Sequence, residues 1–267
     1  MLGPARRSLL RVLGLTFGLA VIIGNTIGAG IFRTPGEIAA HLPTFWPFMS
    51  IWIIGGLYAL LGANALAELG TMIPKSGGQY VFVRHALGDY AGFIVGWSDW
   101  ISTCGSTAAV SIVIGEFAIY LVPHLRAVEV VALAVIAVLT LVQWLGVRWG
   151  GFSQDITSLF KGLVFIFLIG ACFMWGNRNP AASSIEMERE GSLLIAYIVA
   201  LQAVIYTYDG WSAVIYFSEE VKEPEKNIPR AMFGGLIAVI FIYILVNIAF
   251  LRVVSLPTIA GQKMAAG

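Results

Sequence analysis

Charged residues are scarce in this chain. Asp, Glu, Lys and Arg make up 12% of its 267 residues, whereas hydrophobic residues make up 58%. The mean hydropathy is +0.86, and so little polar surface cannot cover a water-soluble globule. The formal net charge of +1 gives no basic field of the kind that attracts nucleic acid. The composition therefore predicts an integral membrane protein in contact with lipid and without a nucleic-acid partner.

The sequence is also poor in residues that build enzyme centres. Its three histidines, His41, His85 and His124, have no paired metal-ligand spacing, so we expect neither a catalytic metal nor another cofactor. Cys104 and Cys172 lie in apolar runs and are interpreted as free thiols that fill small spaces. No phosphate-binding loop with Gly-Lys-Ser/Thr and no Gly-x-Ser-x-Gly nucleophile motif occurs. We therefore expect that the chain is not an enzyme.

Long apolar runs are what the chain has in abundance. About seven stretches approach the length of about 20 residues that a helix needs to cross a bilayer. This predicts an all-α membrane protein with one transmembrane domain, residues 1–267, and short connections. The predicted spans are residues 13–33, 46–70, 90–121, 128–147, 156–176, 193–217 and 232–254.

The distribution of Lys and Arg predicts the orientation. If the spans alternate, the side of the N-terminus carries nine of these residues and the other side five, so the N-terminus is expected in the cytoplasm of a cell-membrane protein. Arg6, Arg7 and Arg11 before an apolar run also fit a cleavable secretion signal. We interpret the first span as an uncleaved anchor, because cleavage would leave the next span to re-establish the orientation.

The first predicted span is interrupted in its middle. Gly24, Gly28 and Gly30 fall within seven residues, and each weakens a helix by roughly 1 kcal/mol relative to Ala. Glycines at this spacing can serve close helix packing. Alternatively they mark a broken helix, which survives at membrane depth only where it lines a protein cavity.

A second interruption lies in the sixth predicted span, where residues 206–212 (YTYDGWS) bring a carboxylate and a glycine into an apolar run. Asp209 is expected to cap a half-helix or to face a cytoplasmic cavity. The two interruptions are five spans apart, so the chain meets the second while running in the opposite direction. Paired interruptions in an inverted repeat indicate a transporter binding site near the bilayer midplane. Helix packing explains either break alone but not this spacing.

Lys161 is the strongest candidate for a functional ionisable residue inside a predicted span. A charge at membrane depth costs at least about 2.5 kcal/mol on insertion scales and by default indicates function. No acidic residue lies one helical turn away. Lys161 either extends its ammonium group to the inner interface or faces the bundle, where it would take the place of a sodium ion and exchange a proton.

Three motifs carry a resemblance to a known family. They are residues 27–32 (IGAGIF), residues 67–80 (AELGTMIPKSGGQY), and YDGW at 208–211 followed by EEV at 219–221 and PEKNIPRA at 224–231. In this order and at these separations, the chain resembles an amino acid permease of the amino acid–polyamine–organocation superfamily, close to its L-type amino acid transporter branch. Residues 218–230 alone are interpreted as a charged cytoplasmic loop, and residues 80–87 as a segment lying along the membrane surface.

The resemblance implies the leucine-transporter architecture, two inverted five-helix repeats whose first and sixth helices are unwound at the substrate. The first repeat would cover about residues 12–177 and a partial second repeat about 191–254. The backbone N–H groups of residues 28–30 would hold the substrate carboxylate, and the carbonyls of residues 206–208 its amino group. Tyr206 would also be an aromatic lid and Lys161 the replacement for sodium. The implied substrate residues are Ile27, Gly28, Ala29, Gly30, Tyr206, Thr207, Tyr208, Gly210 and Trp211.

The resemblance is incomplete in one respect. Members of the family usually have about twelve spans, whereas this sequence provides seven. We therefore expect either a truncated chain or a second polypeptide that supplies the missing helices, and a seven-span product that is unstable or inactive alone. The leading hypothesis is a secondary transporter of amino acids that works by alternating access without sodium, by proton coupling or exchange. The alternative is a truncated, non-transporting membrane protein or an interaction subunit.

Overall fold

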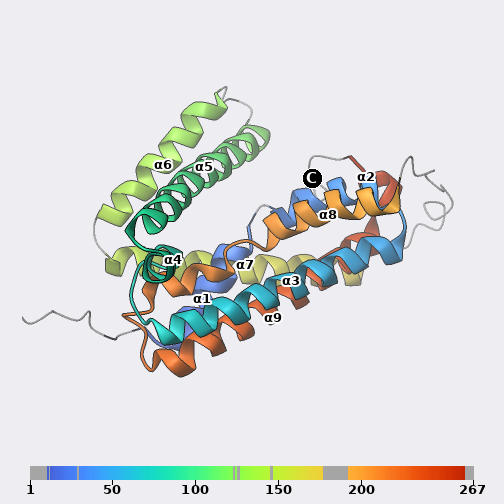
Figure 1. Ribbon diagram of the computed structural model, residues 1–267. Coiled ribbons are helices and arrows are strands. Elements are labelled where there is room, and N and C mark those ends of the chain that lie inside the picture. The colour runs from blue at the N-terminus through green and yellow to red at the C-terminus, as the bar shows by residue number, and fades with distance from the viewer. Residues whose placement is uncertain are drawn as a thin grey trace, which may run out of the picture. The chain divides into compact units, whose positions relative to one another are not determined.

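The computed structural model describes residues 11, 13–28, 30–122, 124, 127–144, 147–176 and 192–261. These residues form helices, and their only β-type pairing is a single bridge between Leu13 and Val221. The helices are α1 (Leu15–Thr26), α2 (Gly30–His41), α3 (Phe45–Met72), α4 (Gln79–Leu87), α5 (Asp89–Leu121), α6 (Val128–Trp144), α7 (Val147–Trp175), α8 (Leu193–Tyr208), the 3₁₀-helix η2 (Trp211–Phe217), α9 (Pro224–Val253) and α10 (Leu256–Ile259) (Figure 1).

The chain divides into two compact units. One comprises residues 1–76 and 157–267, and the other residues 77–156. The first unit contains both of the predicted helix breaks and Lys161. The prediction of a single transmembrane domain built from repeats stays a prediction.

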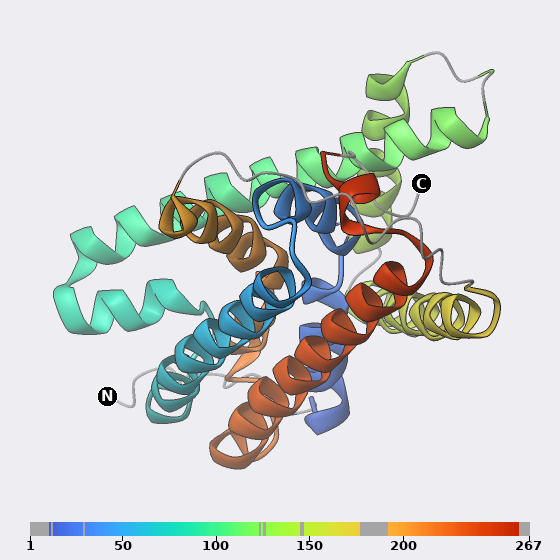
Figure 2. The same cartoon turned by 90° about the vertical axis from the view of Figure 1, so that its right-hand side faces the viewer.

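Helix α9 is the centre of the first unit. It packs against both α1 and α3, and α3 in turn packs against α8 (Figure 2). Glycines allow the helices to approach closely: a Cβ at Gly18 of α1 would lie 2.7 Å from the Cβ of Ala231 in α9, and one at Gly56 of α3 would lie 2.7 Å from Ile240 in α9. In a membrane such close backbone approach supplies packing energy that apolar burial alone does not give.

The second unit contains α4, α5 and α6. Both α4 and α6 pack against α5. A Cβ at Gly92 of α5 would lie 2.7 Å from the Cβ of Arg84, and one at Gly96 would lie 3.0 Å from the ring of Tyr80, so these glycines let α4 lie directly on α5. The predicted segment 80–87 is therefore helical, as α4.

The membrane spans agree with the prediction in kind and differ in number. Among the described residues, five helices are long and apolar enough to cross a membrane, or six if the bent pair α1 and α2 is one span. The fourth predicted span, 128–147, contains α6, which has 17 residues. At 1.5 Å per residue α6 is about 25 Å long, shorter than the hydrocarbon core of about 30 Å.

The predicted loop 218–230 is also shorter than expected. Helix α9 begins at Pro224 rather than near residue 232, so most of the second half of the charged segment is helical. Pro224 occupies the first helical position, where its missing N–H costs nothing and its fixed φ suits the helix. The many charged residues at positions 219–226 favour a loop, so the sequence alone did not predict that the helix starts here.

Candidate functional site

The first break separates α1 from α2. Helix α1 ends at Thr26, and Ile27 has an extended backbone (φ −78°, ψ 101°) while its N–H still donates to the carbonyl of Ile23 at 2.9 Å. Helix α2 begins again at Gly30, and the two helix axes differ by 46°. Ala29 lies outside the described residues. The glycine-rich run is therefore a break of the helix.

The second break separates α8 from η2. Helix α8 ends at Tyr208, and Gly210 has φ 111°, a left-handed conformation that favours glycine. The carboxylate of Asp209 accepts a hydrogen bond from the N–H of Gly210 at 2.9 Å. The 3₁₀-helix η2 has no side-chain cap hydrogen bond at its N-cap Gly210, so both roles expected for Asp209 stay predictions.

The two breaks lie against each other. A Cβ at Gly210 would be 2.8 Å from the carbonyl carbon of Asn25, in the last turn of α1. A Cβ at Gly30 would be 3.1 Å from Cγ2 of Thr207, in the last turn of α8. The distance at Gly210 is shorter than real Cβ contacts allow, so glycine is required there for the backbones to meet. At Gly30 a Cβ would be tight, and the side chain of Thr207 would have to move by a few tenths of an ångström.

Hydroxyl groups join the helix ends across this junction. The hydroxyl of Tyr243, on α9, contacts the carbonyl oxygen of Thr26 at 2.7 Å and that of Thr207 at 3.1 Å. Tyr243 is fully buried. The Oγ1 atoms of Thr34 and Thr207 are 2.6 Å apart. Since Thr207 donates to the carbonyl of Ala203 at 2.9 Å, Thr34 is the donor in the contact between the two threonines.

Lys161 contacts the first break. Its ammonium group donates to the carbonyl oxygen of Gly24 at 2.8 Å. Gly24 is in the last turn of α1, where carbonyl groups lack helical partners and the helix dipole attracts cations. Ile23, Gly24 and Thr26 thus give their carbonyls to an amide, an ammonium and a hydroxyl respectively.

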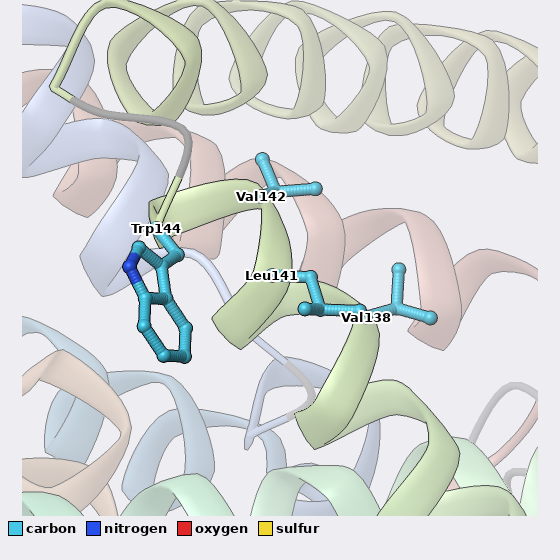
Figure 3. Close-up of a pocket in the computed structure, with 4 residues that line it drawn as sticks. All are labelled: Val138, Leu141, Val142 and Trp144. Atoms are coloured by element: carbon cyan, nitrogen blue, oxygen red, sulfur yellow. The ribbon is translucent and has the colours of Figure 1, made fainter.

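The described residues contain no group of three His, Cys, Asp or Glu side chains that could hold a metal ion. A pocket on α6 is lined by Val138, Leu141, Val142 and Trp144, which Figure 3 shows on neighbouring turns of that helix (Figure 3). This pocket offers no charged group to an amino acid, so the junction of the two breaks is the candidate site.

Comparison with known proteins identifies the family. A model of the amino acid permease family matches residues 8–266. The chain belongs to this family. The relationship covers both breaks, Lys161 and Tyr243.

Several curated relatives of this chain are amino acid transporters by name. The serine/threonine exchanger SteT of Bacillus subtilis is 31% identical over 251 residues, which cover 91% of this chain and 55% of the relative. The b(0,+)-type amino acid transporter 1 of Mus musculus is 34% identical over 269 residues, with 97% and 54% covered. The human Asc-type amino acid transporter 1 is 31% identical over 264 residues, with 94% and 50% covered. The chain therefore spans about half the length of the curated relatives it matches.

Of the residues predicted for the site, the structure places Gly30 against Thr207 and Gly210 against the end of α1. Ile27 and Thr207 are buried at the junction, and an added Cβ at Gly28 would meet no atom within 4 Å. Tyr208 is also buried, and its hydroxyl donates to the carbonyl of Trp52 at 3.2 Å. The indole of Trp211 packs over α3, 2.9 Å from the position of a Cβ at Gly62.

Tyr206 is placed differently from its neighbours. Its side chain is 64% exposed, while its carbonyl oxygen accepts the N–H of Asp209 at 3.2 Å. The ring is therefore not enclosed at the junction, and its role as an aromatic lid stays a prediction.

The sequence analysis missed Tyr243, Thr34 and Trp52. Tyr243 and Trp52 are fully buried and their rings are 5.8 Å apart. A signal for Tyr243 was available, because a hydroxyl in the middle of an apolar span must find a partner inside the protein. Nothing in the sequence alone indicated that this partner would be the ends of two broken helices.

Proposed function

We propose that this chain is part of a secondary transporter that moves an amino acid across the cell membrane by alternating access, with its N-terminus in the cytoplasm. The main support is that the break between α1 and α2 lies against the break between α8 and η2. Each break opens backbone groups at membrane depth, and such groups persist only where protein or a bound ligand satisfies them. The family supports a transporter rather than an enzyme.

The helix ends at the junction complement the two charges of an amino acid. Helix α2 begins at Gly30, and the N–H groups at a helix start favour a carboxylate. We assign the substrate carboxylate to the segment Gly28–Gly30. Helix α8 ends at Tyr208, where carbonyl groups favour a cation. We assign the substrate amino group to the carbonyls of Tyr206–Tyr208, beside Gly210 and Trp211.

We propose that Lys161 is the residue through which transport is coupled to a proton or to exchange. Its ammonium lies on the Gly24 carbonyl at 2.8 Å, so the negative end of α1 already has a cation and needs no sodium ion there. Loss of a proton from Lys161 would remove that cation and free the end of α1. We therefore propose sodium-independent transport, by proton coupling or exchange. The bacterial relative is named an exchanger and the mammalian relatives are named transporters. These names are compatible with both proton coupling and exchange.

The difference in length between this chain and its relatives suggests that additional membrane helices are needed. Since the relatives are about twice as long, we propose that further membrane helices, from the same or a second polypeptide, complete the transport site. The same observation favours an alternative, a membrane protein that keeps the first part of the fold without transporting.

A chimaera tests these two functions against each other. The chain would replace the matching part of the Bacillus subtilis exchanger and be reconstituted in proteoliposomes. We expect uptake of labelled amino acid that increases when unlabelled amino acid is loaded inside and persists when choline replaces sodium. The chain alone is expected to give no uptake. A chimaera that is folded and binds amino acid but does not transport would favour the alternative, and dependence on sodium would contradict the role of Lys161.

A further inference from the structure

The segment before α1 pairs with the loop between η2 and α9. The N–H of Leu13 donates to the carbonyl of Glu220 at 3.0 Å, and the N–H of Lys222 donates to the carbonyl of Leu13 at 2.8 Å. Together they form a parallel bridge between Leu13 and Val221. Val221 is buried. Leu13 and Gly14 are called the strap below.

The loop that receives the strap is held in shape from its other side. The side-chain amide of Asn227 donates to the carbonyl of Lys222 at 2.6 Å. Glu223 has φ 43°, a left-handed conformation that a residue with a side chain keeps only when its surroundings enforce it. The ammonium of Lys226 donates to the Glu223 carboxylate at 2.9 Å and holds the pKa of that carboxyl below its usual range. The loop therefore presents Glu220 and Lys222 to the strap in a fixed arrangement.

The first turn of α1 contacts η2 directly after the strap. The rings of Phe17 and Phe217 meet edge to face at 5.7 Å. A Cβ at Gly18 would lie 3.5 Å from Cγ2 of Val214. Helix α1 ends at the first break and η2 starts at the second, so these contacts join the far ends of two half-helices whose near ends form the candidate site.

We propose that the strap restrains α1 against η2, so that the start of α1 separates from η2 only when the strap leaves the loop. Two backbone hydrogen bonds and one aromatic contact form a small, discrete restraint. Such a restraint can open locally while α9 and α3 stay packed. The strap thus acts as a latch, which holds the start of α1 near the end of η2 while its hydrogen bonds to the loop are formed. This inference concerns the restraint itself and holds whether or not the chain transports.

Hydrogen exchange with proline substitutions tests the latch. Leu13→Pro removes the donor to Glu220 and leaves the Lys222 amide to report on the bridge. Lys222→Pro removes the other donor and leaves the Leu13 amide to report. In both variants we expect the reporting amide and the amides of the first turn of α1 to exchange about tenfold faster or more. Amides in the middle of α9 should keep their parental rates.

Alanine variants separate the backbone pairing from side-chain packing. Leu13→Ala and Lys222→Ala keep both N–H groups and are expected to exchange like the parent at the bridge. Parental exchange in the two proline variants would show that the strap does not hold. Faster exchange confined to the loop, with the first turn of α1 unchanged, would show that the strap does not restrain α1.

A disulfide gives an independent test if a proline variant fails to fold. Cys104 and Cys172 are replaced by Ser, and Leu13→Cys is combined with Val221→Cys. Paired residues of a β-bridge are close enough for a disulfide. After oxidation, we expect slower exchange in both the loop and the first turn of α1, reversed by reduction. A disulfide that forms without slowing exchange in α1 would overturn the proposal.

Discussion

At the residue scale, Tyr243 holds the junction together. One hydroxyl reaches the carbonyls of Thr26 and Thr207, which are the ends of two different helices. An unsatisfied carbonyl in a dry interior costs about 1–3 kcal/mol. The hydroxyl has one hydrogen to donate, so its loss removes the donor that the two carbonyls share. Tyr243 is therefore a positioning residue: it fixes the distance between the breaks.

Substitution of Tyr243 tests this role. We expect Tyr243→Phe to lower the free energy of unfolding in detergent by about 1–3 kcal/mol, measured by thermal or denaturant unfolding. The matched control is Tyr208→Phe, because the hydroxyl of Tyr208 is also buried but reaches only the Trp52 carbonyl, at 3.2 Å. An equal or larger loss in Tyr208→Phe would argue against a special role for Tyr243.

Lys161 supplies the second prediction at this scale. In the chimaera, Lys161→Ala removes a charge-assisted hydrogen bond worth about 1.5–3 kcal/mol, so we expect exchange to fall about tenfold to a hundredfold with membrane insertion unchanged. Lys75→Ala is the control, since Lys75 is exposed and should leave exchange unaffected. Parental rates in Lys161→Ala across the pH range would remove Lys161 from the mechanism.

At the element scale, the two breaks differ in how tightly the backbone is constrained. Gly210 combines φ 111° with a neighbouring backbone in α1, whereas Gly28 faces open space. A side chain at Gly210 would strain both the conformation and the contact. The same substitution at Gly28 meets no atom.

Alanine at these two glycines tests the difference. We expect Gly210→Ala to destabilise the protein by about 1–3 kcal/mol or more, read as a lower unfolding temperature. Gly28→Ala should change stability by less than about 1 kcal/mol. Equal stability of the two variants would mean that α1 and α8 do not meet as described.

The sequence predicted the elements better than their contacts. Runs of apolar residues and glycine clusters are local signals, so the helices, the break near residues 27–29 and the break at 209–210 were all predictable. Lys161 and its span were predicted, but the Gly24 carbonyl as its partner was not. Tyr243 contacts the carbonyls of Thr207 and Thr26, which lie 36 and 217 residues before it in the sequence, and no local pattern encodes these contacts.

Helix ends were predicted less well where local signals conflict. Residues 224–230 carry charges and two prolines, which favour a loop, yet Pro224 starts α9. The charged side chains are tolerated because the first turn of a helix exposes them. Packing of the apolar part of α9 against α1 and α3 then stabilises the whole helix.

At the scale of the whole molecule, the chain belongs to the amino acid permease family and spans about half the length of the curated relatives it matches. The first unit already contains both breaks, Lys161 and Tyr243. A site formed by these elements can therefore be tested for binding without the additional helices that we propose for transport.

Binding of labelled amino acids to the purified chain in nanodiscs tests the central claim, that the two breaks form one amino acid site. A panel of amino acids would be measured with the parent, with Gly28→Leu and with Gly170→Leu, a control glycine on α7 that also has no neighbour within 4 Å. We predict saturable binding that Gly28→Leu abolishes and Gly170→Leu retains, because a leucine at Gly28 fills the space beside the start of α2. Parental affinity in a folded Gly28→Leu protein would contradict the account, since it would show that the break serves only helix packing.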